Sequence, residues 1–255
     1  MKIIIYDIEI TPILGWYYPP AYETRGVLTE RDWHMMSFAW KELGKKKVYV
    51  KALCDYPGYK DDPYNDKALL QDLRNMLDDA DLVIGHNSDR FDNKKANARF
   101  LFHNIEQPSH YDRADTLKMA RAIGKFDSNS LNNLGKYLGL GEKVGSHAGL
   151  WRDCLNGNKK AWKAMKVYNK QDVALTEEVY LKLRGWANTH PNMSKYRKYA
   201  EDVACTYCSS TDFQKRGSKP KGARWRRQYQ CKTCKEYFFG TKSYKVKPYG
   251  DSTQT

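Results

Sequence analysis

The chain has 255 residues, of which 41% are hydrophobic, and its formal net charge at pH 7 is +14. This length suits one domain of ordinary size with a small appendage, and the hydrophobic fraction is enough for a core. No apolar run reaches the roughly 18 residues of a membrane-spanning helix. Acidic residues interrupt the apolar start MKIIIYDIEI, unlike the core of a secretory signal. We therefore expect no membrane partner and a cytoplasmic protein, of a bacterial cell or of a host infected by a virus or phage, that is not secreted.

The positive charge is concentrated towards the C-terminus. Residues 196–255 hold 14 Lys and Arg against 5 Asp and Glu, whereas the first 195 residues hold 30 against 25. A basic segment attached to a nearly balanced body is typical of proteins that bind nucleic acid. Charge alone leaves open the alternative of a soluble protein with a solvated basic surface.

Strands and helices alternate through most of the chain. The β-branched run at 2–8 predicts a buried strand. Alternation at 34–42 and 46–53 predicts two strands joined at Gly44, which can adopt the positive φ of a tight turn. Apolar residues at helical spacing predict a helix over 66–80. The later expected elements are a strand at 82–86, a helix at 92–103, a strand leading into a helix at 111–117, a short helix at 130–140 and one or two long helices at 158–187. This order predicts an α/β fold with a mixed sheet.

Two acidic residues share one face of the first predicted strand. Asp7 and Glu9 are two positions apart in YDIEI, and residues i and i+2 of a strand point to the same side. Burying two charges among isoleucines is costly unless the charges are paired or hold a metal ion. Taken alone, so short a motif is better explained by solvated carboxylates at the end of a strand.

Two later elements supply further acidic residues. Asp92 follows the strand end Gly85-His86-Asn87 and opens a helix, the usual place for a site on an α/β sheet. A helix cap is the structural alternative for Asp92, and Asn87 is a candidate contact to nucleic acid. Tyr168 and Asp172 are four apart and share a helix face. A core Tyr followed by an Asp that starts a new helical segment is the alternative for this pair.

Together, the three motifs resemble those of the DnaQ-like 3′→5′ exonucleases of the ribonuclease H-like superfamily, over roughly residues 1–188. The D-x-E pair, the Asp after the G-H-N strand end and the Y-x-x-x-D pair match the family's tyrosine subclass, called DEDDy. The histidine subclass would carry His where Val167 stands. Ile10 departs from the family, which often has Thr there. The resemblance implies a ribonuclease H-like mixed β-sheet flanked by helices.

The resemblance also implies a mechanism. Asp7 would bridge two Mg²⁺ or Mn²⁺ ions, Glu9 and Asp172 would help to hold the ion that activates water, and Asp92 would serve the second ion. Tyr168 would orient the attacking water. The protein would then be a metal-dependent 3′→5′ exonuclease that hydrolyses phosphodiester bonds and releases nucleoside 5′-monophosphates. The alternatives are a catalytically silent nucleic-acid-binding protein with this fold and a ribonuclease H-like endonuclease or transposase-type protein.

Four of the six cysteines form two C-x-x-C pairs, Cys205 with Cys208 and Cys231 with Cys234. Two such pairs can supply four thiolates at the corners of a tetrahedron, which is the geometry of structural Zn²⁺. Four cysteine ligands leave no open position for catalysis. We therefore predict a zinc ribbon with one structural Zn²⁺, with redox-active or free thiols as the alternative.

Between the two cysteine pairs, basic residues alternate with aromatic ones. Attraction to phosphate combined with stacking of bases on aromatic rings is how sequence-tolerant proteins bind single strands. A solvated hairpin is the alternative. The predicted nucleic-acid contacts in this segment are Arg224, Trp225, Arg226, Arg227 and Tyr229.

These patterns predict four parts of the chain. They are a DEDDy exonuclease domain at 1–190, a linker at 191–200, a zinc-ribbon nucleic-acid-binding module at 201–246 and a disordered tail at 247–255. The predicted partner is nucleic acid with a 3′ end, DNA ahead of RNA. A separate polymerase, repair or recombination protein is a further expected partner, because no polymerase domain fits in this length.

Overall fold

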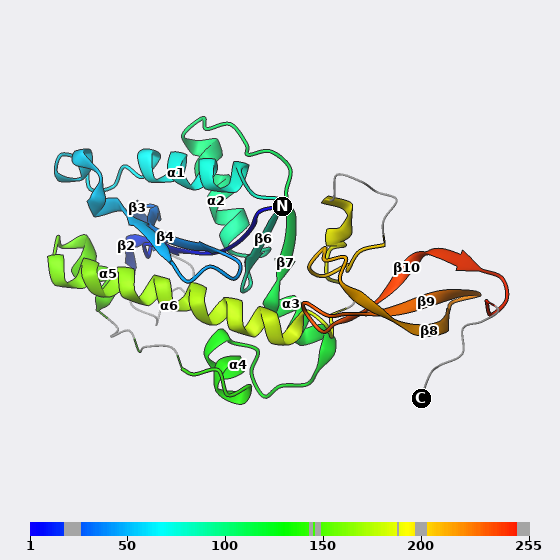
Figure 1. Ribbon diagram of the computed structural model, residues 1–255. Coiled ribbons are helices and arrows are strands. Elements are labelled where there is room, and N and C mark those ends of the chain that lie inside the picture. The colour runs from blue at the N-terminus through cyan, green and yellow to red at the C-terminus, as the bar shows by residue number, and fades with distance from the viewer. Residues whose placement is uncertain (18–26, 143–144, 146–148, 188, 197–202, 249–255) are drawn as a thin grey trace. The chain divides into compact units, whose positions relative to one another are not determined.

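The structure is a computed structural model of the chain, and it describes residues 1–17, 27–142, 145, 149–187, 189–196 and 203–248 (Figure 1). Contacts within the chain define two compact units, Lys2–Tyr180 and Leu181–Thr255, so the division falls ahead of the predicted boundary at residue 190. Among the described residues, no helix combines the length and apolar character that crossing a bilayer requires.

The N-terminal unit is built on a five-stranded mixed sheet with the strand order β5-β4-β1-β6-β7. Its strands are β1 (Ile3–Ile10), β4 (Met35–Glu42), β5 (Tyr49–Ala52), β6 (Leu82–Gly85) and β7 (Asp112–Asp115). β1 pairs antiparallel with β4 and parallel with β6, while β4 pairs antiparallel with β5 and β6 pairs parallel with β7. The register places Glu9 opposite Ser37 and Ser37 opposite Ala52. The C-terminal ends of β1 and β5 therefore lie on the same side of the sheet, where β4 begins.

Helices cover both faces of this sheet. Figure 1 shows α1 (Lys67–Asp78) and α2 (Asp92–Phe102) over one face and α6 (Lys159–Leu183) over the other. The apolar stripe of α1 is fully buried, as its helical spacing requires. The remaining helices of the unit are α3 (Thr116–Ile123), α4 (Leu131–Tyr137), α5 (Leu150–Leu155) and the 3₁₀ turns η1 (Leu53–Asp55) and η2 (Pro57–Lys60).

Alternation along β1 assigns its side chains to the two layers. Tyr6, at an even position, donates a hydrogen bond from its hydroxyl to Asn93 Oδ1 of α2 at 2.7 Å. Asp7, at an odd position, accepts one from the side chain of Asn169 in α6. Since side chains of a strand alternate between faces, Glu9 lies on the α6 side together with Asp7.

The C-terminal unit contains a three-stranded antiparallel sheet with the order β10-β9-β8. Its strands are β8 (Phe213–Lys221), β9 (Arg224–Cys231) and β10 (Tyr237–Tyr244), and a 3₁₀ turn, η3 (Met193–Tyr196), precedes them. Cys205, Cys231, Tyr229 and Phe238 are its buried centre. So small an apolar centre suits a module that relies on a metal for stability.

The α/β class and the order of the elements predicted from the sequence are confirmed, and the segment 158–187 contains one long helix, Lys159–Leu183, rather than two. Two strands, β2 (Leu14–Tyr17) and β3 (Val27–Arg31), were not predicted. Trp16 and Leu28 in this hairpin are exposed, so no burial pattern marks it in the sequence. The predicted disordered tail lies, from residue 249 on, outside the described residues.

Candidate active site

Three carboxylates converge between β1 and α6. One carboxylate oxygen from each of Asp7, Glu9 and Asp172 lies within 4.8 Å of the other two. Asp7 and Glu9 are half-buried, whereas Asp172 is only 3% exposed. Like charges held this close repel one another, and a divalent cation removes that cost. Oxygen donors of this kind are the ligands preferred by Mg²⁺ and Mn²⁺, so the donor set fits the predicted ion.

A buried amide holds the Asp7 side chain in place. Asn169 is fully buried, and its Nδ2 donates to Asp7 Oδ2 at 2.6 Å and to the Asp7 carbonyl oxygen at 3.2 Å. Its Oδ1 in turn accepts from the Ser37 hydroxyl of β4 at 3.1 Å. Sequence reasoning missed Asn169 and Ser37. The only signal for Asn169 was its position three residues before Asp172, on the same side of the helix.

Asp92 lies outside this group of three oxygens. It opens α2 and is 3% exposed, and its Oδ1 accepts from the backbone N–H of Ile8, the residue between Asp7 and Glu9. Burial raises the pKa of Asp92 to about 7, with a smaller contribution from the nearby charge of Asp115. The carboxylate thus joins the start of α2 directly to the strand that carries the other acids.

The loop before Asp92 is fixed by another buried carboxylate that sequence reasoning did not assign to the site. Asp115 Oδ1 accepts from Asn87 N–H at 3.0 Å, and its Oδ2 accepts from Asp89 N–H at 3.1 Å. Asn87 adopts a positive φ of 62°. A Cβ at Gly85 would lie 2.5 Å from the Ser88 Cβ, so only glycine allows this turn. Asp115, at the end of β7, therefore positions the loop that leads to Asp92.

Tyr168 lies one helical turn before Asp172 on α6. It is half-buried, and its ring meets Trp151 edge to face with the centroids 5.9 Å apart. Residues four apart on a helix are neighbours on its surface. The structure therefore places a phenol beside the carboxylate group and supports its ring from α5.

The four cysteines of the two C-x-x-C pairs meet in the C-terminal unit. One Sγ from each of Cys205, Cys208, Cys231 and Cys234 lies within 4.8 Å of the others, with the Cys205 and Cys234 sulfurs 3.5 Å apart. Four sulfurs at this separation fit a tetrahedral ion bound by thiolates, the arrangement of structural zinc. This cluster is compatible with a zinc ribbon.

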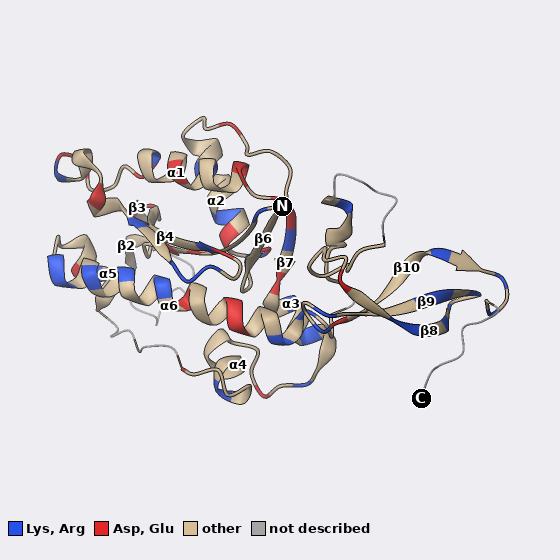
Figure 2. Cartoon of the chain, in the orientation of Figure 1, with Lys and Arg blue, Asp and Glu red and all other residues tan. Residues whose placement is uncertain are grey.

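The basic hairpin of the C-terminal unit presents Lys and Arg along β8 and β9 (Figure 2). Arg224 is exposed, and Trp225, Arg226 and Arg227 are partly exposed. Tyr229 is different, because its ring stacks on Phe238 and meets Phe213 edge to face in the buried centre. The prediction that Tyr229 stacks on a base is therefore wrong, and this residue supports the fold of the C-terminal unit instead.

A comparison with models of protein families identifies the superfamily to which the N-terminal unit belongs. The family whose model is described as the RNase_H superfamily matches residues 22–184. The chain belongs to the RNase_H superfamily. A search of curated proteins found no match.

Membership in the RNase_H superfamily supports a role in hydrolysing nucleic acid, and hence a nucleic-acid substrate. Members of the superfamily that are nucleases use divalent metal ions, which agrees with the carboxylate group between β1 and α6. The matched segment contains Asp92, Tyr168 and Asp172 but begins after Asp7 and Glu9. The assignment of those two residues to the site therefore rests on the structure, which brings them to Asp172.

Proposed function

We propose that the chain is a metal-dependent 3′→5′ exonuclease that shortens nucleic acid, with DNA as the favoured substrate, and releases nucleoside 5′-monophosphates. The observation that carries the proposal is the meeting of Asp7 and Glu9 from β1 with Asp172 from α6, one turn after Tyr168. This combination agrees with the tyrosine subclass that the sequence resembles.

Each residue has a distinct part in the proposed reaction. Asp7, Glu9 and Asp172 would hold the catalytic Mg²⁺ or Mn²⁺, and Asp92 would serve a second ion beside them. Such ions, when bound, activate water and stabilise the leaving oxygen at phosphorus. Tyr168 would orient the attacking water through its hydroxyl, because it lies one helical turn before Asp172 on α6.

The experiment measures Mg²⁺- and Mn²⁺-dependent hydrolysis of 5′-labelled single strands by the parent and by Asp7→Ala and Asp172→Asn. Loss of either carboxylate should reduce hydrolysis to background while the circular dichroism spectrum stays that of the parent. Glu178→Gln is the matched control, because Glu178 is an exposed acid on the same helix. Hydrolysis at the parental rate in both carboxylate variants would overturn the proposal.

Tyr168→Phe separates the orienting role from metal binding. Removing the hydroxyl should lower the rate without changing the Mg²⁺ concentration that gives half-maximal hydrolysis, because no carboxylate is lost. A loss as large as that in Asp172→Asn, together with a changed Mg²⁺ dependence, would assign Tyr168 another role.

We also propose that the C-terminal unit binds one Zn²⁺ through its four cysteines and contacts the substrate strand through Arg224, Trp225, Arg226 and Arg227. Phosphate attraction by arginine is sensitive to salt, and stacking on Trp is not sequence-specific. Replacing Arg224 and Arg226 by Glu should therefore weaken binding to all strand sequences alike and lower its salt dependence. Unchanged binding of single strands would exclude this surface as the contact.

A further inference from the structure

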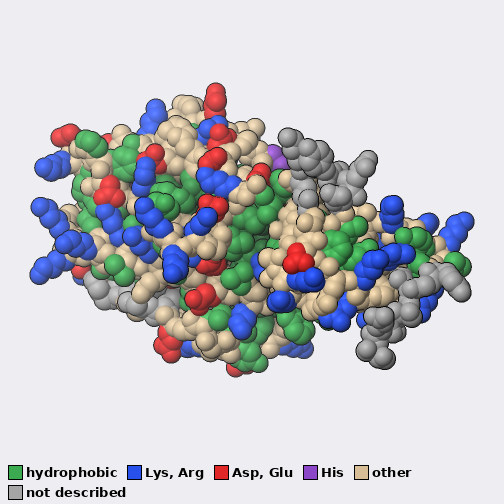
Figure 3. Space-filling view, viewed as in Figure 1, with side chains coloured by type: hydrophobic (Ala, Val, Ile, Leu, Met, Phe, Trp, Pro, Cys, Tyr) green, Lys and Arg blue, Asp and Glu red, His purple; other side chains and the backbone are tan. Residues whose placement is uncertain are grey.

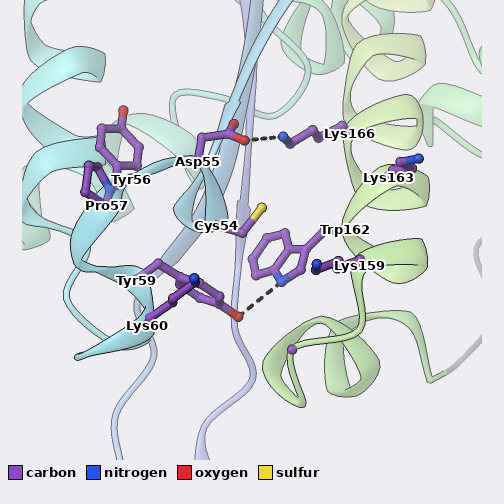
Figure 4. A pocket seen from close by; sticks show the side chains of 11 residues that line it. Cys54, Asp55, Tyr56, Pro57, Tyr59, Lys60, Lys159, Trp162, Lys163 and Lys166 are labelled. Carbon is purple, nitrogen blue, oxygen red and sulfur yellow. Dashed lines mark hydrogen bonds and ion pairs between the residues drawn. The ribbon is translucent and has the colours of Figure 1, made fainter.

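A cavity in the N-terminal unit lies away from the carboxylate group, and none of Asp7, Glu9 and Asp172 lines it. Its volume is about 660 Å³, and it lies between α6 and the segment Cys54–Lys60 that follows β5. Figure 4 shows Lys60 and Lys159 approaching it from opposite walls, with Tyr59 and Trp162 between them. We call this cavity the Lys/Trp pocket. Its volume falls in the range of cavities that hold a small organic ligand.

Hydrogen bonds fix the apolar floor of the Lys/Trp pocket. Trp162 is 4% exposed, and its Nε1 donates to the Tyr59 hydroxyl at 3.1 Å. The same hydroxyl donates to the carbonyl oxygen of Cys154 at 3.3 Å, and the two rings meet edge to face with centroids 5.8 Å apart. A floor held in this way is already formed before a ligand arrives, which lowers the entropic cost of binding.

The rim of the pocket is strongly positive. Four lysines line it against one acidic residue, Asp55, which forms an ion pair with Lys166. Within the described residues, Lys60, Lys159 and Lys163 have no carboxylate partner. Figure 3 shows Lys and Arg side chains gathered over the end of the unit where α6 begins. Lysine ammonium groups around an apolar floor suit a ligand with both an anionic and an apolar part.

The pocket lies on a different side of α6 from the carboxylates. Lys159 and Lys163 precede Asp172 by 13 and nine residues. At about 100° per residue, their side chains point about 140° and 180° around the helix from Asp172. A ligand in the Lys/Trp pocket would therefore not occupy the proposed site of hydrolysis.

We propose that the Lys/Trp pocket binds a nucleotide unit, with the base against the partly exposed ring of Tyr59, which the buried Trp162 holds in place, and the phosphate at Lys60 and Lys159. The unit comes either from a free nucleotide or from a nucleic-acid strand, since both offer the same chemistry. Aromatic and apolar side chains accept any base, and ammonium groups supply the attraction to phosphate. The proposal concerns binding without catalysis, so it stands apart from the proposed exonuclease activity.

The test measures binding to the full chain by calorimetry, without added Mg²⁺ so that no strand is hydrolysed. The probes are adenosine 5′-monophosphate, a 5′-phosphorylated deoxyadenosine tetranucleotide, adenosine and inorganic phosphate. The pocket variant is Lys60→Glu/Lys159→Glu. The control is Lys46→Glu/Lys160→Glu, which changes the net charge equally at exposed lysines that do not line the pocket.

The pocket variant should bind at least one nucleotide probe tenfold or more weakly than the parent, and the control should stay within twofold. A loss for both nucleotide probes identifies a site open to free nucleotides, whereas a loss for the tetranucleotide alone identifies a site for a strand. Equal binding by pocket and control variants would overturn the proposal. It would also fail if adenosine or inorganic phosphate alone bound as tightly as the monophosphate.

Two further measurements guard against misfolding of the pocket variant and separate the pocket from the site of hydrolysis. Lys60→Gln/Lys159→Gln removes the charges without reversing them and serves if the Glu variant does not fold, and it should show the same pattern of loss. Hydrolysis of saturating substrate in Mg²⁺ by the pocket variant should match that of the control variant. A parent that binds nucleotide in the pocket but hydrolyses nothing would sink the proposed function and leave the pocket in place.

Discussion

Asn169 gives the sharpest test of how the site is held together. Asn169→Ala removes two donors to Asp7 and the acceptor of the Ser37 hydroxyl. Partners that orient a metal-binding side chain typically contribute a factor of about 10 to 100 in metal affinity or activity. We therefore expect the Mg²⁺ concentration for half-maximal hydrolysis to rise about 10- to 100-fold, equivalent to about 1.4–2.7 kcal/mol.

The assay is the initial rate of hydrolysis of a 5′-labelled single strand over a Mg²⁺ titration. Ser37→Ala is the matched control, because it leaves both Asn169 donors to Asp7 in place and should shift the titration by less than about threefold. The loss of the buried amide should also lower the free energy of unfolding by about 1–3 kcal/mol. A Mg²⁺ titration unchanged in Asn169→Ala would refute the positioning role.

Three further predictions concern the rest of the molecule. Glu177→Gln breaks the buried ion pair with Lys41 and should lower the free energy of unfolding, measured in urea titrations, by about 3–5 kcal/mol. The double variant Lys41→Met/Glu177→Gln should recover much of this loss, because it leaves no unpaired buried charge. Equal losses in the single and the double variant would contradict this prediction. Cys208→Ser should reduce the bound Zn²⁺ found by elemental analysis and loosen the C-terminal unit in hydrogen exchange, while hydrolysis of very short strands persists. Burial lowers the pKa of His34, so the folded state favours its neutral form and the free energy of unfolding falls as the pH drops below about 6.5. His34→Gln should make the free energy of unfolding less dependent on pH in this range. An equally steep pH dependence in His34→Gln would contradict this prediction.

The main elements of the N-terminal unit could be predicted because their apolar patterns match their burial. The continuous β-branched run in β1 and the helical spacing of apolar residues in α1 both correspond to buried residues in the structure. The exposed hairpin of β2 and β3 has no such pattern, and its pairing depends on contacts that the local sequence does not show. Short, solvent-exposed strands are therefore among the elements that the sequence did not predict, together with the short helix α5.

The candidate site was predictable where it depends on spacing and not where it depends on tertiary contact. Asp7, Glu9 and Asp172 could be grouped by their order and context, and the structure brings them together. Asn169 and Asp115 act through hydrogen bonds to residues far away in the chain, so the neighbouring sequence did not indicate these partners. Polar residues with long-range partners need the fold before their role can be assigned.

For Tyr229, the sequence instead suggested a binding role that the structure contradicts. An aromatic residue among arginines suggests stacking on bases, yet strand alternation turns its ring towards Phe213 and Phe238. Trp162 and Tyr59 were likewise not linked in the sequence, because they are 103 positions apart and meet only when α6 packs beside the segment after β5. For an aromatic residue in a basic segment, it must therefore be known whether its ring faces the buried centre or the solvent before a binding role is inferred.

The most direct test of the central claim compares a 5′-labelled linear single strand with a closed circle of the same sequence in Mg²⁺. The proposed exonuclease should convert the linear strand into a ladder that shortens from its 3′ end and should leave the circle intact. Asp172→Asn should leave both the linear strand and the circle intact. Cutting of the circle by the parent, with no cutting by Asp172→Asn, would keep the carboxylates as the catalytic group but contradict the requirement for a 3′ end.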